Sequence, residues 1–461
     1  MNHAALRWAA PLVPAFAIYF TPSSLAADAR HLLAIFTGTI IALIARPVPM
    51  GASVVLAMTL LVLTNTLTPA RALAGFASPT TWMIFSAFLF ARAVTSTGFG
   101  PRIAYVLIDR IGHSPLTLGY AVAATNLVLA PFIPSDTGRG GGIVFPVARS
   151  LAQALGDLPK TSAYLILVGY LSTYTTSGMF LTSMAANPIM AEIARKSHGL
   201  DVTFLTWAIA AIVPGVLTLA IGPLIILRAT PPESQDIKAA RAMAADELKK
   251  LGNLNPRELR LVIILLGVMA GWITSPWHGL HNAFVALGGL CALVISEVVT
   301  WEEMLGEKRA WDALLWFGPI LMMTDELAKA GLFSVLSQSV VGVTGGMPWQ
   351  VTFFALCAGY LYIHYAFASM TSQATALYAG FLGAGIAAGA PPMMIAIVLA
   401  AFSSLNAGIT HYGTGSATVF FGAGFVTQGQ WWRVGFVLSL MILAVWLGIG
   451  PLWWKLVGVW P

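Results

Sequence analysis

The sequence predicts an all-α integral membrane protein with about eleven transmembrane helices and two re-entrant hairpins arranged in two inverted repeats. Three observations support this fold class: a very apolar composition, long apolar blocks, and two halves with the same pattern of polar interruptions. Of the 461 residues, 58% are hydrophobic and only 9% are charged, whereas a soluble domain carries about 25% charged residues. Lipid is therefore the expected solvent for most of the surface.

Apolar blocks recur along the chain, for example Leu261 to Ile273, Phe284 to Ile295 and Phe436 to Leu447. With their flanks they reach roughly 20 residues, which is enough to cross a hydrocarbon core of about 30 Å. Because lipid offers no partners to backbone N–H and C=O groups, such blocks are expected to be helical.

One long polar stretch, Arg228 to Arg260, divides the chain near its middle. Its basic residues, among them Lys249, predict a cytoplasmic position by the positive-inside rule. The N-terminus is expected on the same side, and the C-terminus on the periplasmic side because the number of spans is odd. The chain contains no GxxxxGK[ST] phosphate loop, so coupling to ATP hydrolysis within it is not expected.

The two halves resemble each other at an offset of 233 or 234 positions, which is the sign of an internal repeat. The segment that begins at Trp82 parallels the one that begins at Trp316, and Pro134 to Thr137 parallels Ala368 to Thr371. An odd number of spans before the second copy inverts its orientation in the membrane.

Four polar clusters interrupt the apolar sequence: Pro134 to Gly142, Thr175 to Pro188, Ser369 to Gln373 and Asn406 to Ser416. Unwound backbone at membrane depth is tolerated only inside the protein or beside a wet cavity. The N-terminal ends of half-helices attract carboxylates, whereas hydroxyl and carbonyl oxygens can hold a cation. The alternative is that Ser and Thr bond to their own helices and Gly allows close helix packing.

These clusters resemble those of the divalent anion/sodium symporters, in particular the branch of bacterial citrate, tartrate and succinate carriers and plastid 2-oxoglutarate/malate translocators. The segments that carry the resemblance are Pro134 to Pro146, Phe367 to Phe381 and Thr410 to Gly424. Members of this family have a Ser-Asn-Thr type motif at each hairpin tip, where substrate carboxylates and, in the symporters, sodium bind. The resemblance implies a homodimer whose transport domains move against a fixed scaffold by an elevator-type mechanism.

The predicted organisation has five parts. They are residues 1–78, N-terminal scaffold helices; 79–229, the first inverted repeat with its hairpin; 230–260, the cytoplasmic linker; 261–310, scaffold helices of the second half; and 311–461, the second inverted-repeat core with its hairpin. The resemblance places this multi-pass chain in a bacterial inner (plasma) membrane.

The resemblance implies substrate contacts at both hairpin tips, and the polar interruptions predict further contacts at both broken helices. The residues are Ser135, Asp136, Thr137, Thr182, Ser183, Ser369, Thr371, Ser372, Thr410, His411, Thr414 and Gly415. Cation contacts are expected at Ser135, Asp136, Gly178 and Ser369. Neither tip keeps the asparagine of the motif, because Asp136 and Met370 stand in its place, and this puts the usual sodium sites in question. No cofactor, catalytic residue or other metal site is expected beyond Na⁺ or H⁺ as a coupling ion.

Asp136 has three alternative roles. An ionised carboxylate at membrane depth is costly, and beside a dianionic substrate it repels the substrate. A bound cation, a proton shared at raised pKa, or a pair with Arg139 three residues on would resolve this conflict, and the pair is the favoured expectation. His411 could contact a carboxylate or change charge near neutral pH, although a buried histidine is more often a neutral hydrogen-bond donor.

Other polar and aromatic residues are assigned structural roles. Asp325, Glu326 and Lys329 are expected at a helix end at the membrane surface rather than along a substrate pathway. Trp431, Trp432, Trp453 and Trp454 are expected to be interfacial anchors. Cys291 and Cys357 are expected to be packing residues.

The expected function is secondary active transport of dicarboxylate or tricarboxylate anions with four to six carbon atoms. Exchange is favoured because the branch contains exchangers and both asparagines are missing. The alternatives are a sodium- or proton-coupled dicarboxylate symporter, and a carrier of sulfate, a sulfonate or another organic anion. An enzyme is not expected, since neither an HExxH helix nor a nucleophile motif is present. The expected partners are small carboxylates, membrane lipid and a second copy, but not nucleic acid.

Overall fold

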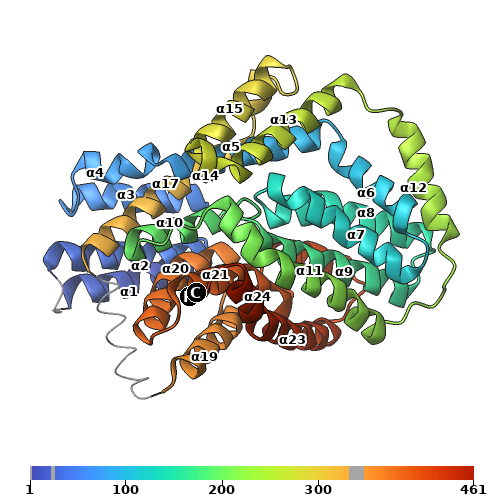
Figure 1. Ribbon diagram of the computed structural model, residues 1–461. Helices are drawn as coiled ribbons and strands as arrows, with labels where there is room; N and C mark the ends of the chain where they lie inside the picture. The colour runs from blue at the N-terminus through green and yellow to red at the C-terminus, as the bar shows by residue number, and fades with distance from the viewer. Residues whose placement is uncertain (1–2, 22–25, 332–346, 461) are drawn as a thin grey trace.

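The computed structural model describes residues 3–21, 26–331 and 347–460, and in these ranges all regular elements are helices (Figure 1). The N-terminal part lies at one end of the molecule. It consists of α1 (His3–Phe20), α2 (Ala27–Ala45), α3 (Met50–Leu63), the short α4 (Pro69–Leu73) and η1 (Ala74–Ala77).

The first half continues with two helices, a helical hairpin, a broken helix and a long helix. These are α5 (Pro79–Ser96) and α6 (Phe99–Ile111); hairpin 1, formed by α7 (Pro115–Leu129), η2 (Ala130–Phe132), η3 (Thr137–Val144) and α8 (Phe145–Ala154); broken helix 1, formed by α9 (Pro159–Met179) and α10 (Asn187–His198); and α11 (Phe204–Ala229).

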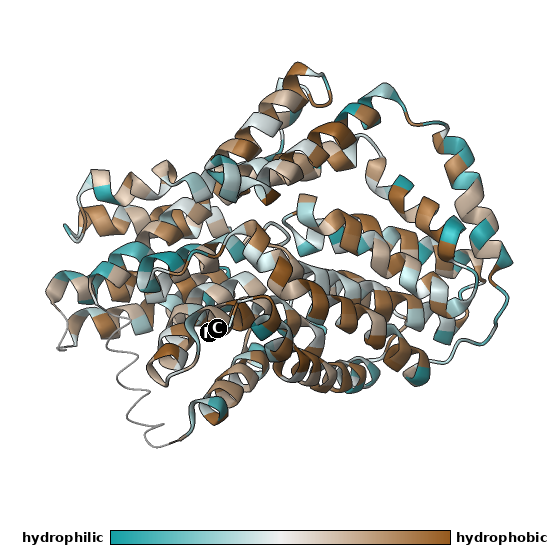
Figure 2. Cartoon of the chain, viewed as in Figure 1, coloured by the Kyte–Doolittle hydropathy of each residue, from teal (hydrophilic) through white to brown (hydrophobic). Residues whose placement is uncertain are grey.

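A linker helix, α12 (Lys238–Leu251), leads into the second half. Four helices follow: α13 (Pro256–Ile273), α14 (Ser275–His278), α15 (Asn282–Ile295) and α16 (Trp301–Leu305). Figure 2 shows that hydrophilic residues gather on α12 and on the loops at its ends.

The remaining elements repeat the order of the first half. They are α17 (Lys308–Lys329); hairpin 2, formed by α19 (Trp349–Tyr362), η4 (Ile363–Ala366) and α20 (Met370–Ala387); broken helix 2, formed by α21 (Pro392–Leu405), η5 (Asn406–Ile409) and α22 (Gly415–Phe421); and α23 (Gln428–Ala444), η6 (Val445–Ile449) and α24 (Gly450–Leu456).

Five helical stretches of the described chain are long and apolar enough to cross a membrane: Ala27–Ala45, Pro115–Phe132, Phe204–Ala229, Pro392–Ile409 and Gln428–Leu456. A sixth would combine Pro69–Ala77 with Pro79–Ser96, which are bent by 47° relative to each other. The prediction of an all-helical fold with several apolar helices is confirmed, whereas about eleven spans and the re-entrant course of the hairpins stay predictions.

The centre of the molecule is formed by α9 and α21, the helices that precede the two breaks. All residues of α9 from Thr161 onward are buried, as are all residues of α21 from Met394 onward. The helices cross closely, because a Cβ on Gly178 would lie 3.0 Å from the carbonyl oxygen of Ala401. The helices that precede the two breaks therefore form one packed unit.

The end of the linker is fixed to the first half by a buried ion pair. Arg102 of α6 donates from Nε and Nη2 to the two carboxylate oxygens of Glu258 at 2.8 and 3.0 Å, and from Nη1 to the carbonyl of Gly252 at 2.7 Å. Glu258 also accepts the N–H of Asn255 at 3.0 Å, which completes the capping box of α13. A bidentate pair with further hydrogen bonds offsets the cost of burying both charges.

Charged residues at the end of α17 are ion-paired. Asp325 pairs with Lys196 of α10, and Glu326 pairs with Arg71 of α4 and with Lys329, the latter at 2.7 Å. These three residues thus lie in the last turns of a helix.

Two of the tryptophans contradict the expectation of interfacial anchors. Trp431 and Trp454 are 1% and 0% exposed, because one packs on Tyr170 at 4.8 Å between ring centroids and the other donates to the carbonyl of Ala210 at 2.8 Å. The packing role expected for the cysteines holds for the buried Cys357, but it is wrong for Cys291, which is exposed on α15.

We predict that Lys249→Cys resists a membrane-impermeant thiol reagent in intact cells and reacts after permeabilisation. The side chain of Lys249 is 79% exposed on α12, so access to the reagent depends on the membrane alone. Labelling should be measured in a Cys291→Ser background, with the background protein alone as the control. Efficient labelling in intact cells would show that the linker is outside and that the predicted orientation is reversed.

Candidate functional site

The tip of hairpin 1 starts a π-helix. Ser135 Oγ accepts the N–H of Gly138 at 3.0 Å, and η3 then continues through three successive glycines. A Cβ on Gly140 would lie 2.4 Å from the side chain of Thr173 on α9. The absence of a side chain at this position lets the hairpin backbone lie directly on the broken helix.

Arg139 of η3 points into the core and is 0% exposed. Its Nε donates to Asn126 Oδ1 at 3.1 Å, and its Nη1 donates to the carbonyl oxygens of Ile133 at 2.8 Å and Ser183 at 3.1 Å. The guanidinium thus connects α7, the turn of hairpin 1 and the break between α9 and α10.

The third nitrogen of this guanidinium faces α9. Arg139 Nη2 donates to the carbonyl of Thr173 at 3.1 Å and to the hydroxyls of Thr176 at 3.2 Å and Ser177 at 2.7 Å. All its partners are neutral oxygens, and in the part of the chain that the structure describes no carboxylate lies within 4.0 Å of it. Arg139 is a buried cation held in an oxygen cage.

The predicted pair between Asp136 and Arg139 is wrong. Asp136 Oδ2 instead accepts the hydroxyls of Thr414 and Ser416, both at 2.8 Å. The expectation assumed that residues three apart share one face of a regular helix. The wider π-helical winding of η3 turns Arg139 toward α9 and leaves Asp136 facing α22 of the other half.

Asp136 belongs to a cluster that joins the two halves. Thr414 Oγ1 also accepts the N–H of Ser416 at 2.9 Å and so caps α22. Thr137 packs against the exposed Gly415, where a Cβ would lie 2.8 Å from Thr137 Oγ1. We name these five residues, Asp136, Thr137, Thr414, Gly415 and Ser416, the Asp136 cluster.

Hairpin 2 carries a related network around Gln373, which stands at the repeat position of Arg139. Its Nε2 donates to the carbonyl of Tyr360 at 2.7 Å, and its Oε1 accepts Asn406 Nδ2 at 2.8 Å and also contacts His364 Nδ1. His364 Nε2 lies 3.0 Å from the carbonyl oxygen of Gly413. Both ring nitrogens therefore face acceptors, and only a protonated imidazole can donate to both.

The loop within broken helix 2 contacts both hairpins with adjacent residues. The carbonyl of Gly413 faces His364 of hairpin 2, and the hydroxyl of Thr414 donates to Asp136 of hairpin 1. This loop is the point where the two polar networks meet.

Three predicted residues of broken helix 1 use their polar groups internally. Thr182 donates to the carbonyl of Pro131 at 2.6 Å, Ser183 donates to that of Ser177 at 2.7 Å, and the carbonyl of Gly178 accepts Trp207 Nε1 at 2.9 Å. The structure places them around the Arg139 cage and not in the Asp136 cluster.

The predicted residues at the tip of hairpin 2 and Thr410 in the break of broken helix 2 differ in whether their hydroxyls are hydrogen-bonded. Ser369 caps α20 by accepting the N–H of Ser372 at 3.3 Å. The hydroxyl of Thr371 makes no hydrogen bond within the described ranges. The side-chain oxygens of Ser372 and Thr410 are buried without a hydrogen-bond partner there.

His411 accepts the indole N–H of Trp432 at its Nδ1, at 3.1 Å. In this contact the ring is an acceptor, whereas the expectation was a hydrogen-bond donor.

The sequence analysis did not single out Asn126 and His364, and it placed Thr176, Ser177 and Asn406 in polar clusters without naming them as site residues. The available signal was polar groups within apolar helices, and the offset of 234 positions that relates Asn126 to Tyr360 and Arg139 to Gln373.

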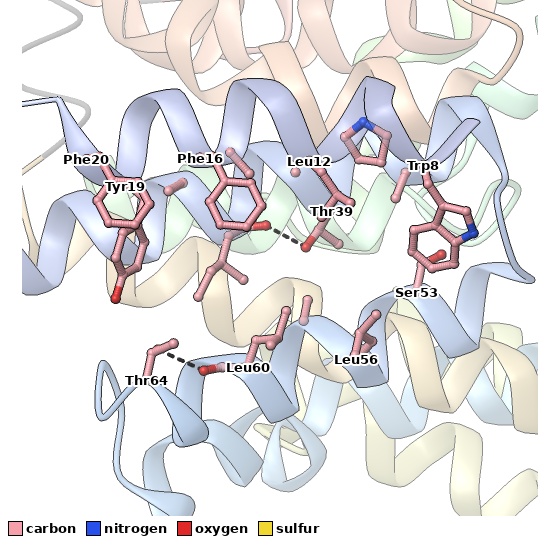
Figure 3. Close-up of a pocket in the computed structure, with 17 residues that line it drawn as sticks. Trp8, Leu12, Phe16, Tyr19, Phe20, Thr39, Ser53, Leu56, Leu60 and Thr64 are labelled. Carbon is pink, nitrogen blue, oxygen red and sulfur yellow. Dashed lines mark hydrogen bonds between the residues drawn. The ribbon is translucent and has the colours of Figure 1, made fainter. Parts of the chain in front are cut away.

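A separate cavity of about 230 Å³ lies between α1, α2 and α3 (Figure 3). Trp8, Phe16 and Leu56 are among its apolar lining residues, and the hydroxyls of Thr39 and Thr64 donate to carbonyls of their own helices. The lining residues that the structure describes are uncharged.

Two hairpins and two broken helices that bring hydroxyls, amides and unwound backbone together in a buried core define a membrane transporter. The chain belongs to the family described as the sodium:sulfate symporter transmembrane region, whose model matches residues 3–460. This confirms the family resemblance and indicates a transporter rather than an enzyme.

Named relatives cover most of the chain. One is YflS from Bacillus subtilis (strain 168), which carries the name "putative malate transporter". It is 43% identical over 95% of this chain and 93% of its own length. The chloroplastic dicarboxylate transporter 1 of Spinacia oleracea is 40% identical over 95% of this chain and 79% of its own length.

Two solved structures share the fold. The YdaH transporter of Alcanivorax borkumensis superposes with a TM-score of 0.58 at 15% identity, over 84% of this chain and 88% of its own. MtrF of Neisseria gonorrhoeae gives a TM-score of 0.56 at 13% identity, over 98% of this chain and 93% of its own.

We predict that Thr414→Val lowers the thermal stability of the detergent-purified protein. The variant removes a hydroxyl that donates to the Asp136 carboxylate and caps α22, and a hydrogen bond to a charged group contributes about 1.5 to 3 kcal/mol. The matched control is Thr418→Val on the same helix, whose hydroxyl donates only to the carbonyl of Gly415. Equal unfolding temperatures for the two variants would contradict a stabilising role for the Asp136 cluster.

Proposed function

We propose that this chain is a secondary active transporter that exchanges dicarboxylate or tricarboxylate anions across the bacterial inner membrane. The names of the relatives support a dicarboxylate substrate, and the bacterial relative YbhI is named an inner membrane protein. Within the described residues the Thr371 hydroxyl has no hydrogen bond, and the Thr137 hydroxyl has only a long one of 3.5 Å to Asp136. These hydroxyls offer the donors that a carboxylate needs.

The main support for exchange that does not need sodium is the oxygen cage around Arg139. Unwound carbonyls and hydroxyls beside a hairpin tip are the ligands that sodium takes in transporters with broken helices. Here the guanidinium of Arg139 already fills such a set of oxygens. The positive charge is therefore part of the chain, and hairpin 1 needs no dissolved cation.

Hairpin 2 also leaves few free oxygens for a dissolved cation beside Gln373. The oxygens of Gln373 and Gly413 already face the two ring nitrogens of His364. Met370, which is buried, offers no oxygen ligand at this tip.

We also propose the elevator-type movement and the homodimer that the family resemblance implies. The close packing of α9 on α21 supports a core of broken helices and hairpins that moves as one body.

Cation-coupled symport is the second candidate, and one observation favours it. Three buried oxygens of the Gln373 network have no hydrogen-bond partner in the described ranges: Ser372 Oγ, Asn406 Oδ1 and Thr410 Oγ1. Such atoms are the ligands that a sodium ion or a hydronium ion would use.

We predict that proteoliposomes preloaded with succinate, malate or citrate take up labelled carboxylate in sodium-free choline buffer. Empty proteoliposomes are the control and should take up none, because exchange needs an internal partner. Uptake into empty vesicles that requires inward sodium and rises steeply with its concentration would contradict exchange and support the symporter.

We further predict that Thr137→Ala and Thr371→Ala each raise the apparent Km for the exchanged carboxylate or abolish exchange. Each loses a hydroxyl that donates to the substrate, and a hydrogen bond to a charged group contributes about 1.5 to 3 kcal/mol, or roughly tenfold or more in affinity. Folded protein is checked by gel filtration. Unchanged exchange in both variants would remove the hairpin tips from the binding site.

A further inference from the structure

We propose that Arg309 of α17 is a substrate-binding residue, which supplies the positive charge for a dicarboxylate at the tip of hairpin 1 from a helix outside the hairpins. This inference rests on the proposed function and extends it to one further residue. Arg309 belongs to neither polar network described above, and no motif in the sequence singles it out.

The guanidinium of Arg309 faces the tip of hairpin 1. Its Nη1 lies 3.7 Å from the position that a Cβ would take on Gly138, and the hydroxyl of Ser135 lies 3.2 Å from the same position. Because Gly138 carries no side chain, nothing from that residue separates the guanidinium from the tip. Arg309 is exposed and the tip is half-buried, so a ligand at the tip can reach both.

No acidic group neutralises Arg309. The carboxylate of Glu307 accepts the backbone N–H of Arg309 at 3.4 Å, and Asp312 one turn on points to α3, with Oδ1 2.6 Å from a Cβ position on Gly51. Within the described residues, no carboxylate oxygen lies within 4.0 Å of its guanidinium.

The position is also unfavourable for a cation that has no ligand. Arg309 lies in the first turn of α17, where the helix dipole presents partial positive charge and favours acidic residues. The capping carboxylate of Glu307 accepts a backbone N–H at this end. The dipole still disfavours a basic side chain here, and a bound anion would remove this unfavourable interaction.

The charges of hairpin 1 explain why a further cation is needed. Asp136 and Arg139 carry opposite charges three residues apart, so the tip has no net charge of its own. Asp136 faces the half-exposed side, whereas Arg139 is fully buried, so an arriving dianion meets the carboxylate first. Arg309 makes the balance at the tip positive.

Arg309 lies on the linker side of the molecule. Arg257, at the start of α13 directly after the linker, donates to the carbonyl of Val298 at 2.7 Å and pairs with Glu303 of α16 at 3.2 Å. The start of α17 follows α16 immediately, so this side is the predicted cytoplasmic one. If the hairpins move relative to α17, Arg309 does not move with them. It would then contact the substrate only in the state in which the binding site is open to the linker side.

The test measures exchange of labelled succinate from each side separately, in everted and in right-side-out membrane vesicles. Arg309→Gln should raise the Km for succinate on the linker side by about tenfold, the effect of losing a charged hydrogen bond, with less than about a twofold change on the opposite side. Arg309→Lys should recover part of the affinity because it restores the charge. Lys308→Gln, which removes the neighbouring cation of the same helix start, is the matched control and should behave as the wild type.

An unchanged linker-side Km in Arg309→Gln, with normal wild-type exchange, would overturn the inference and leave the proposed function intact. An equal rise of Km on both sides would also overturn it, because Arg309 would then support the site without discriminating between its two states. Wild-type vesicles that show no exchange would overturn the proposed function, and this inference with it.

Discussion

The first half of the molecule depends on the hydrogen bonds of one buried guanidinium. Arg139 cannot lose its charge in a protein, so each of its N–H groups must find an acceptor where water is absent. Its acceptors come from α7, the turn of hairpin 1, α9 and the break after α9. The unwound carbonyl of Ser183 is one of them, so the interruption of the helix is part of what stabilises the charge. The hairpin and the broken helix are therefore held together by the same side chain.

The second half uses the same positions with a different chemistry. At the position of the guanidinium the second half has the neutral amide of Gln373. Its side-chain oxygen contacts the imidazole of His364 and accepts a hydrogen bond from the amide of Asn406. Within the described residues, the first cage gives every N–H of its cation an acceptor, whereas Ser372, Asn406 and Thr410 beside the second network have oxygens without a partner. The two copies of one structural unit therefore stabilise the same position with different groups.

Patterns spread over many residues could be predicted from the sequence, and contacts between single side chains could not. Apolar blocks, glycine-rich interruptions and the repeat offset predicted the helical fold and the family, because they reflect the solvent and the backbone. The pair between Asp136 and Arg139 was wrong because the prediction assumed regular helical winding, and the sequence does not reveal a π-helix. The interfacial position expected for Trp431 is wrong because the general preference of tryptophan for membrane interfaces does not reveal that this one packs on Tyr170. The approach of Arg309 to Gly138 joins segments far apart in the chain, and no local pattern encodes it.

The loop at Gly413 and Thr414 has a mechanical consequence. A peptide unit is planar, and its two Cα atoms are held about 3.8 Å apart, so one unit behaves as a rigid bar. The carbonyl of Gly413 in this unit is hydrogen-bonded to His364 of hairpin 2. The side-chain hydroxyl of Thr414, the next residue, is hydrogen-bonded to Asp136 of hairpin 1. A displacement of either hairpin that preserves its hydrogen bond therefore moves this loop. The loop's contact with the other hairpin must then follow, rotate at the Thr414 side chain or break, so the loop is where a movement of one tip is first transmitted to the other.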